Sequence, residues 1–269
     1  MKHFFEHWGN IKVRIQQAEN LFLLLDYDGT LTPIVSLPEK AVCPSEVKRH
    51  LEKLRDLPGV FLAIISGRST EDLREKVGVS GIIYVGNHGL EIQDSSGKHN
   101  RFLSSARPRE LQRIAQNLQK SLKGIPGILF EEKGPILSVH YRNVPRKFFE
   151  RIPQALEEEL QQWKDRWRIA SGKMVLEIQP QIDFHKGKAV TEILKTIPSI
   201  GLLPIYLGDD RTDEDGFRVL KGQGISVLIG PGEPPSEADF FLQDPDEVHE
   251  FLLRCQEARL GGNRCLGAT

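Results

Sequence analysis

The chain has 269 residues, with 36 Lys and Arg against 37 Asp and Glu, so its formal net charge is only −1. Without a basic block or stripe, this balance disfavours a nucleic-acid partner, and three scattered cysteines are too few for a disulfide framework or a zinc site. The chain shows neither a secretory signal at its start nor an apolar run of membrane-spanning length, so we expect a soluble, cytoplasmic protein with no membrane partner.

The first part of the chain predicts a helix followed by strands that alternate with helices. Phe4, Phe5, Trp8 and Ile11 form a rough apolar stripe that we expect to pack on the core. Apolar runs that are typical of buried strands follow at residues 21–26, 60–66, 82–86, 202–208 and 225–230, and amphipathic segments such as 44–57 lie between most of them. This alternation predicts a parallel sheet with helices on both faces, whose site forms at the carboxyl ends of the strands.

The middle third of the sequence departs from this alternation. After a hairpin over residues 91–102 comes a helix-like segment at 108–123, then two strands at 127–133 and 136–142. A second helix over 145–163, with an irregularity at Pro153, precedes two more strands at 167–171 and 173–179. The order helix, hairpin, helix, hairpin predicts a small α+β module inserted from about residue 107 to 183, with hinges near 105–108 and 182–186.

Four polar segments each end or follow a predicted parallel strand: residues 26–33, 66–69, 185–189 and 208–215. Asp26 and Asp28 follow an apolar strand, and the alternation of an extended chain predicts that both side chains point to the same side and repel each other. This arrangement requires positive charge between or beside them. The segment GDDRTDED has five carboxylates within seven residues, which need hydration or a cation. Each segment alone is weak, but together they predict a functional site at one edge of the sheet.

This combination of motifs resembles the haloacid-dehalogenase (HAD) superfamily of phosphatases, through Asp26-x-Asp28-Gly29-Thr30, Ser66, Lys186 and Gly208-Asp209-Asp210 in that order. Within it the chain resembles the trehalose-6-phosphate phosphatase family, through DYDGTLTPI, SGR, GNHGLEI, EEKGPILSVHYR, KMVLEIQP, HKGKA and GDDRTDED. The resemblance implies an α/β fold with a Rossmannoid, HAD-like core over 1–106 and 184–269 and an inserted, smaller α+β cap domain over 107–183. Because no synthase domain precedes these motifs, we expect a stand-alone phosphatase.

The resemblance implies hydrolysis of trehalose 6-phosphate to trehalose and phosphate. Asp26 would attack phosphorus to form an aspartyl-phosphate, and Asp28 would protonate the leaving sugar oxygen and later activate water. Lys186 and Ser66 would contact the phosphoryl group. Backbone N–H groups of Gly29 and Thr30 would do the same.

The resemblance also implies a Mg²⁺ cofactor, since this ion prefers oxygen ligands. Side-chain oxygens of Asp26 and Asp209 and the main-chain carbonyl of Asp28 would bind the ion. Asp210 and Asp213 would support these ligands or bind through water.

Substrate choice would depend on side chains that hydrogen-bond the disaccharide. In the inserted module, Glu131 and Lys133 match the E-x-K pair with which the family holds glucose units. Further candidates are His140 and Arg142, predicted to share one strand face, Lys173 and Glu177 at or in the last strand, and Arg68, Asn87, His88 and Glu91 from the core.

Two other functions remain open at this point. One is hydrolysis of another sugar phosphate, such as sucrose 6-phosphate or a glycosyl phosphoglycerate, or phosphotransfer to a second sugar, which would keep the same Asp pair. The other is a sensor that binds sugar phosphate without turnover, which the presence of Asp26, Asp28 and Lys186 disfavours. The core motifs do not separate the sugars, whereas the cap segments favour trehalose 6-phosphate. Protein partners and oligomeric state stay open.

Overall fold

The computed structural model describes residues 1–35, 40–101, 108–172, 174–181, 185–232 and 235–262. They belong to two compact units, Met1–Arg101 with Phe184–Thr269, here the core unit, and Phe102–Asp183, here the cap unit. The domain boundaries predicted at 106/107 and 183/184, and most of the two predicted hinges, fall outside the described residues.

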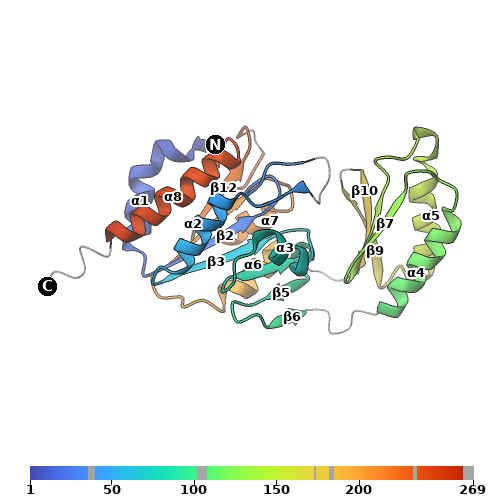
Figure 1. Ribbon diagram of the computed structural model, residues 1–269, viewed down its shortest axis with the longest axis horizontal. Coiled ribbons are helices and arrows are strands. Elements are labelled where there is room, and N and C mark those ends of the chain that lie inside the picture. Colours follow the sequence, from blue (N-terminus) through green and yellow to red (C-terminus); the bar gives the residue numbers. More distant parts are fainter. Residues whose placement is uncertain (36–39, 102–107, 173, 182–184, 233–234, 263–269) are drawn as a thin grey trace. The chain divides into compact units, whose positions relative to one another are not determined.

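The core unit is built on a sheet with the strand order β1-β13-β12-β11-β2-β3-β4-β5-β6 (Figure 1). Pairing is parallel from β1 to β4, as the sequence predicts, and the hairpin β5-β6 extends the sheet in antiparallel fashion. The strands are β1 Lys2–His3, β2 Asn20–Asp26, β3 Val60–Ile65, β4 Ile83–Gly86, β5 Glu91–Gln93, β6 His99–Arg101, β11 Leu202–Gly208, β12 Ile225–Ile229 and β13 Phe240–Leu242. The helices are η1 Phe4–His7, α1 Trp8–Gln17, α2 Ser45–Arg55, α3 Thr70–Val77, η3 Asn87–Gly89, α6 Lys186–Leu194, α7 Glu214–Leu220 and α8 Pro245–Gly262.

Helices cover both faces of this sheet, so the central strand β2 is apolar throughout its length. Leu21, Leu23 and Leu25 pack in a cluster with residues of α1, α2 and α8. Phe22 and Leu24 point the other way and pack with residues of α6 and α7. Side chains alternate along a strand, so Asp26 at the end of β2 continues on the α6 face.

The predicted N-terminal stripe packs on the core, but the helix begins later than expected. Phe4 is fully buried and Ile11 is 2% exposed, with Phe5 and Trp8 packed against the same cluster. Residues Phe4–His7 form a 3₁₀ turn, and the α-helix starts at Trp8. Among the helices described, none combines the length and the apolar character needed to cross a membrane.

The cap unit is an antiparallel sheet, β7-β8-β10-β9, with α4 and α5 on one face (Figure 1). Leu137, Val139, Leu176 and Ile178 point toward the helices and form the unit's own apolar core. The elements are α4 Pro108–Ser121, β7 Leu129–Lys133, β8 Ile136–His140, η4 Arg146–Phe148, α5 Arg151–Leu160, η5 Gln161–Trp163, β9 Trp167–Gly172 and β10 Val175–Pro180.

Two local predictions in the cap unit need correction. Strand β8 ends at His140, so Arg142 lies in the following turn and does not share a strand face with His140. Pro153 is the third residue of α5, where the missing N–H has no intrahelical partner to lose. The helical irregularities lie instead in the 3₁₀ turns η4 and η5 on either side of α5.

Candidate active site

The end of β2 places Asp26 against Lys186, the first residue of α6. Lys186 Nζ donates hydrogen bonds of 2.7 Å to Asp26 Oδ1 and of 2.7 Å to Asp213 Oδ1. These three side chains are at most 6% exposed. Burial alone lowers the pKa of Lys186, but Asp213 and Asp26 outweigh it and raise that pKa above its ordinary value. Lys186 is therefore a fixed positive charge beside the candidate nucleophile.

Asp213 is held from two further sides. The Tyr206 hydroxyl donates to Asp213 Oδ1 at 2.7 Å, and the Asp210 backbone N–H donates to Asp213 Oδ2 at 3.0 Å. Burial and the neighbouring carboxylates raise the pKa of Tyr206, so this phenol stays a donor. Tyr206 was not among the residues predicted from the sequence, although a tyrosine inside an apolar strand usually signals a buried hydrogen bond.

A carboxylate cluster suitable for a cation lies at this strand end. Asp26, Asp209 and Asp213 each offer an oxygen, and these atoms all lie within 4.8 Å of one another. Burial raises the pKa of Asp26 despite Lys186, and burial with Asp213 and Asp210 raises the pKa of Asp209 to about 7. Three carboxylates against one ammonium leave excess negative charge, which a divalent cation with oxygen preference would balance. The donor set fits Mg²⁺. Asp210, in contrast, is exposed, and its Oδ1 accepts from the Arg211 N–H at 2.6 Å.

The turn after β2 approaches Asp209 closely. Gly29 has φ +89°, and a Cβ at this position would lie 2.0 Å from Asp209 Oδ2, so only glycine fits. The Gly29 N–H donates to the Thr32 carbonyl at 2.7 Å and is thus used inside the turn, contrary to the expected contact with phosphate. The Thr30 hydroxyl is buried and has no hydrogen-bond partner among the described residues.

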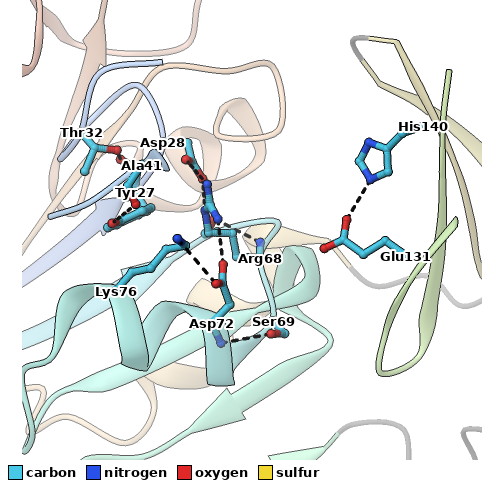
Figure 2. A network of polar contacts seen from close by, with 11 residues as sticks. Tyr27, Asp28, Thr32, Ala41, Arg68, Ser69, Asp72, Lys76, Glu131 and His140 are labelled. Atoms are coloured by element: carbon cyan, nitrogen blue, oxygen red, sulfur yellow. Dashed lines mark hydrogen bonds and ion pairs between the residues drawn. The ribbon is translucent and has the colours of Figure 1, made fainter. Parts of the chain in front are cut away.

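Asp28 lies beyond the end of β2, so strand alternation does not extend to it. Its carboxylate accepts two hydrogen bonds from Arg68, from Nε at 2.6 Å and from Nη2 at 2.7 Å (Figure 2). Arg68 Nη1 donates to Asp72 Oδ2 at 2.7 Å. Each carboxylate of the D-x-D motif therefore has its own cation, Lys186 for Asp26 and Arg68 for Asp28. Arg68, expected to reach the substrate, here binds two carboxylates.

The loops after β3 and β4 bring Ser66 and the Asn87-His88 pair together. Ser66 is 2% exposed, and its hydroxyl oxygen accepts from the Arg68 backbone N–H at 3.2 Å, which leaves the hydroxyl proton to donate elsewhere. The His88 N–H donates to the Ser66 carbonyl at 3.1 Å. Asn87 and His88 have φ +50° and +55°, a conformation that costs non-glycine residues on the order of 1 kcal/mol or more each. The side-chain amide of Asn87 is buried and has no hydrogen-bond partner among the described residues, as expected of a group that binds a ligand.

Glu91, a candidate for substrate contact, is hydrogen-bonded inside the core unit. It is 6% exposed, and its Oε2 accepts from the backbone N–H of Thr70 at 3.3 Å and from the Thr70 hydroxyl at 3.1 Å. Thr70 is the first residue of α3, so this carboxylate ties the start of α3 to β5.

In the cap unit, candidate residues gather on the sheet face opposite α4 and α5. Glu131 Oε2 lies 2.8 Å from His140 Nε2 (Figure 2). In register, Glu131 is opposite Ser138 on β8, and Ser138 is opposite Glu177 on β10. The Ser138 hydroxyl donates to Glu177 Oε1 at 3.2 Å. A polar row thus crosses three neighbouring strands.

The polar row continues toward β9 through residues that the sequence analysis missed. Gln179 donates to Glu177 Oε2 at 2.8 Å, and Arg168 donates to Gln179 Oε1 at 3.4 Å. Strand register would have identified them, since Gln179 lies two residues from Glu177 and opposite Arg168. Lys133 ends β7, but its side chain and all of Lys173 lie outside the described part of the structure.

Comparison with protein families gives a match over most of the chain. The family model described as trehalose-phosphatase matches residues 24–246. Trehalose-phosphate phosphatase B of Arabidopsis thaliana is 35% identical over 260 residues, covering 91% of this chain and 68% of that protein. A probable trehalose-phosphate phosphatase 2 of rice is 36% identical over 268 residues, covering 90% of this chain and 69% of that protein.

Solved structures share the fold. The C-terminal domain of Candida albicans trehalose-6-phosphate phosphatase superimposes with a TM-score of 0.75 at 24% identity, covering 93% of this chain and 96% of that chain. A haloacid dehalogenase-like hydrolase from Bacteroides thetaiotaomicron gives a TM-score of 0.61 at 19% identity, covering 87% of this chain and 98% of that chain. These likenesses establish the HAD-like α/β fold.

Proposed function

The chain belongs to the trehalose-phosphatase family, and from this membership we propose that it hydrolyses trehalose 6-phosphate to trehalose and inorganic phosphate. The family resemblance seen in the motifs is confirmed by the family model and by the named relatives. The observation that carries the reaction class is the buried cluster of Asp26, Asp209 and Asp213 around Lys186 at the end of a parallel strand.

Asp26 is the proposed nucleophile. Its carboxylate attacks phosphorus, the bond from phosphorus to the sugar oxygen breaks, and an aspartyl-phosphate forms. Hydrolysis of that intermediate returns the free carboxylate and releases phosphate. This division into two steps addresses an uncatalysed barrier that enzymes lower by on the order of 20 kcal/mol. The hydrogen bond from Lys186 orients the Asp26 carboxylate and supplies positive charge for the incoming phosphoryl oxygens.

Asp28 is the proposed general acid and base. It delivers a proton to the departing sugar oxygen and then takes a proton from the water that attacks the aspartyl-phosphate. Ser66, with a hydroxyl proton left to donate, is proposed to hydrogen-bond the phosphoryl group. The buried Thr30 hydroxyl and Asn87 side-chain amide, which have no hydrogen-bond partner in the described part of the chain, support a polar ligand near these loops.

Magnesium is the proposed cofactor, held by Asp26, Asp209 and the main-chain carbonyl of Asp28. Asp213 already accepts from Lys186, Tyr206 and the Asp210 N–H, which suits a residue that supports the site. When bound, Mg²⁺ would supply positive charge that offsets the repulsion between the nucleophile and the anionic phosphate.

The disaccharide is proposed to bind through the polar face of the cap sheet. Glu131 and Glu177 are the carboxylate acceptors for sugar hydroxyls, and His140 and Ser138 are neighbouring hydrogen-bonding groups. Lys133, Lys173 and Arg142 remain candidates from the motifs alone.

The test of the proposed function is phosphate release from a panel of substrates. Trehalose 6-phosphate, sucrose 6-phosphate, glucose 6-phosphate and mannosyl phosphoglycerate are each assayed with Mg²⁺ and with chelator. We expect metal-dependent release with a preference for trehalose 6-phosphate of about a hundredfold, or about 2.7 kcal/mol of differential transition-state binding. Metal-dependent release with a preference for another sugar phosphate would support the proposed reaction and refute trehalose 6-phosphate as the substrate. No phosphate release from any of the four substrates would indicate a sensor.

A further inference from the structure

Arg68 binds two carboxylates at once, and only one of them belongs to the D-x-D motif. Nε and Nη2 donate to Asp28 at 2.6 and 2.7 Å, and Nη1 donates to Asp72 at 2.7 Å. Figure 2 shows the guanidinium between the two carboxylates, one from the turn after β2 and one from α3. The Arg68 side chain is 12% exposed, against 38% for Asp28 and 39% for Asp72. The cation is thus the most buried member of the group, and every nitrogen of its guanidinium donates to a carboxylate.

Asp72 is positioned by its helix. The Ser69 hydroxyl caps α3 by accepting from the Asp72 backbone N–H at 3.2 Å. Asp72 follows Arg68 by four residues, and Lys76 lies one turn further with Nζ 3.9 Å from Asp72 Oδ1. Asp28, in contrast, follows the end of β2 and has only an isolated bridge to Thr32. Of the two carboxylates that Arg68 binds, Asp72 is the one fixed in regular structure.

The observed pairing occupies both oxygens of the Asp28 carboxylate. Oδ1 accepts from Nη2 and Oδ2 from Nε of Arg68, so turning the Asp28 carboxylate toward the oxygen of a leaving group breaks this two-point pairing. Arg68 then loses its two hydrogen bonds to Asp28. Losing a carboxylate is costly for a largely buried cation, because the desolvation of the guanidinium is then less well compensated. The hydrogen bond to Asp72 persists and offsets part of this cost.

We infer that Asp72 is a positioning residue that retains the Arg68 guanidinium while Asp28 turns toward the leaving oxygen. The ion pair between Arg68 and Asp72 lowers the cost of breaking the pair between Arg68 and Asp28. Asp72 acts through Arg68 and does not touch the substrate. This inference rests on the proposed function for the role of Asp28, and it adds a residue that none of the sequence motifs contains.

The test compares leaving groups in the Asp72→Asn variant, which keeps the size and hydrogen-bonding oxygen of the side chain but removes its charge. The substrates are p-nitrophenyl phosphate, phenyl phosphate and trehalose 6-phosphate, each with Mg²⁺. Phenol, with a pKa of about 10 like that of tyrosine, and a sugar hydroxyl need a proton on departure far more than p-nitrophenol does. We expect kcat/KM to fall about fivefold or more for phenyl phosphate and trehalose 6-phosphate, and less than about twofold for p-nitrophenyl phosphate.

Four comparisons separate positioning from a purely structural effect. Glu75→Gln removes an exposed carboxylate from the same helix and should leave all three substrates unaffected. Asp72→Glu restores the charge and should recover part of the loss. Inhibition by inorganic phosphate, which reports binding, should not change in Asp72→Asn. In an Arg68→Ala background, Asp72→Asn should have no further effect, because residues that act through one another are not additive.

Equal losses on the three substrates, weaker phosphate inhibition in Asp72→Asn, or full additivity with Arg68→Ala would each overturn the inference. A wild-type protein that hydrolyses the aryl phosphates but not trehalose 6-phosphate refutes the proposed substrate, while the ratio of the two aryl phosphates still decides the role of Asp72. A wild-type protein that hydrolyses none of the three refutes both.

Discussion

In the core unit, the charged cluster of Asp26, Lys186 and Asp213 is buried at the ends of parallel strands, whereas in the cap unit the charged candidates stand on one face of an antiparallel sheet. The ion pair of Asp26 and Lys186 joins side chains that are 6% and 3% exposed. The pair of Glu131 and His140 joins side chains that are 47% and 25% exposed. Carboxylates paired with basic side chains therefore occur in a buried environment in the core unit and in a solvent-exposed environment in the cap unit.

The difference in burial predicts which unit tolerates substitutions of its charged residues. Removing one partner of a buried ion pair leaves an uncompensated charge and costs about 3–5 kcal/mol, while an exposed pair contributes about 0–1 kcal/mol. Core residues such as Lys186 and Asp213 depend on one another, so substitutions there act on the whole cluster. The cap face can exchange single side chains at little cost to folding, which suits a surface that selects the sugar.

The largest expected effect breaks the core chemistry for every substrate. Asp26→Asn keeps the shape of the side chain but removes the nucleophile, so turnover should fall by about 10⁴-fold or more. The assay is phosphate release from trehalose 6-phosphate and from p-nitrophenyl phosphate, with thermal unfolding to check the fold. Substantial residual activity on either substrate would show that another residue is the nucleophile.

A smaller effect should be confined to the sugar substrate. Glu131→Ala should lower kcat/KM for trehalose 6-phosphate about a hundredfold and leave p-nitrophenyl phosphate within about twofold, because the aryl group lacks sugar hydroxyls. Glu132→Ala is the matched control, since Glu132 is exposed and alternates to the other face of β7. Equal losses on both substrates, or equal effects of the two variants, would remove Glu131 from the sugar site.

Metal should stabilise the core unit in a pH-dependent way. Burial raises the pKa values of Asp26 and Asp209, the latter to about 7, so the metal-free folded protein binds more protons than the unfolded chain. The stability of the metal-free protein should then fall as pH rises from about 4 through about 7. Mg²⁺ competes with these protons, so the stabilisation that Mg²⁺ adds to the folded core unit should be larger above pH 7.

Thermal unfolding with and without Mg²⁺ measures this effect. At a concentration of about a hundred times its Kd, Mg²⁺ should raise the free energy of unfolding by about 2.7 kcal/mol at about pH 8, and by clearly less at about pH 5.5. Asp209→Asn should abolish most of the gain at both pH values. An equal gain at both pH values in the wild type would contradict a site built on these two carboxylates.

The smallest effect concerns the helix that carries Asp72. Ser69→Ala removes the cap of α3 and should cost about 1 kcal/mol of stability. Because the units have separate apolar cores, amide hydrogen exchange should accelerate in the core unit while β8 and β10 of the cap unit keep their protection. An equal loss of protection in both units would show that they unfold together.

Local patterns in the sequence determined most of the elements. Apolar runs located β2, β3, β4, β11 and β12, and alternation located the two cap hairpins. A strand buried on both faces is apolar throughout, whereas a strand buried on one face alternates apolar and polar residues. The motifs also identified Asp26, Asp209 and Lys186, which the structure brings to one strand end. The two- and three-residue strands β1 and β13 gave no signal, since a periodic pattern needs more residues than they contain.

Which polar groups pair with one another depends on the tertiary structure. Lys186 meets Asp26 across 160 positions of sequence, and Arg68 meets Asp28 across 40. No local pattern contains such distances, so the separate cations of Asp26 and Asp28, the hydrogen bond from Tyr206 to Asp213 and the use of Glu91 at α3 were not predictable. The ends of the strands, and the charges that lie there, could be predicted from the sequence because hydrophobic periodicity is local. The order of strands in the sheet then decided which of those charges become neighbours.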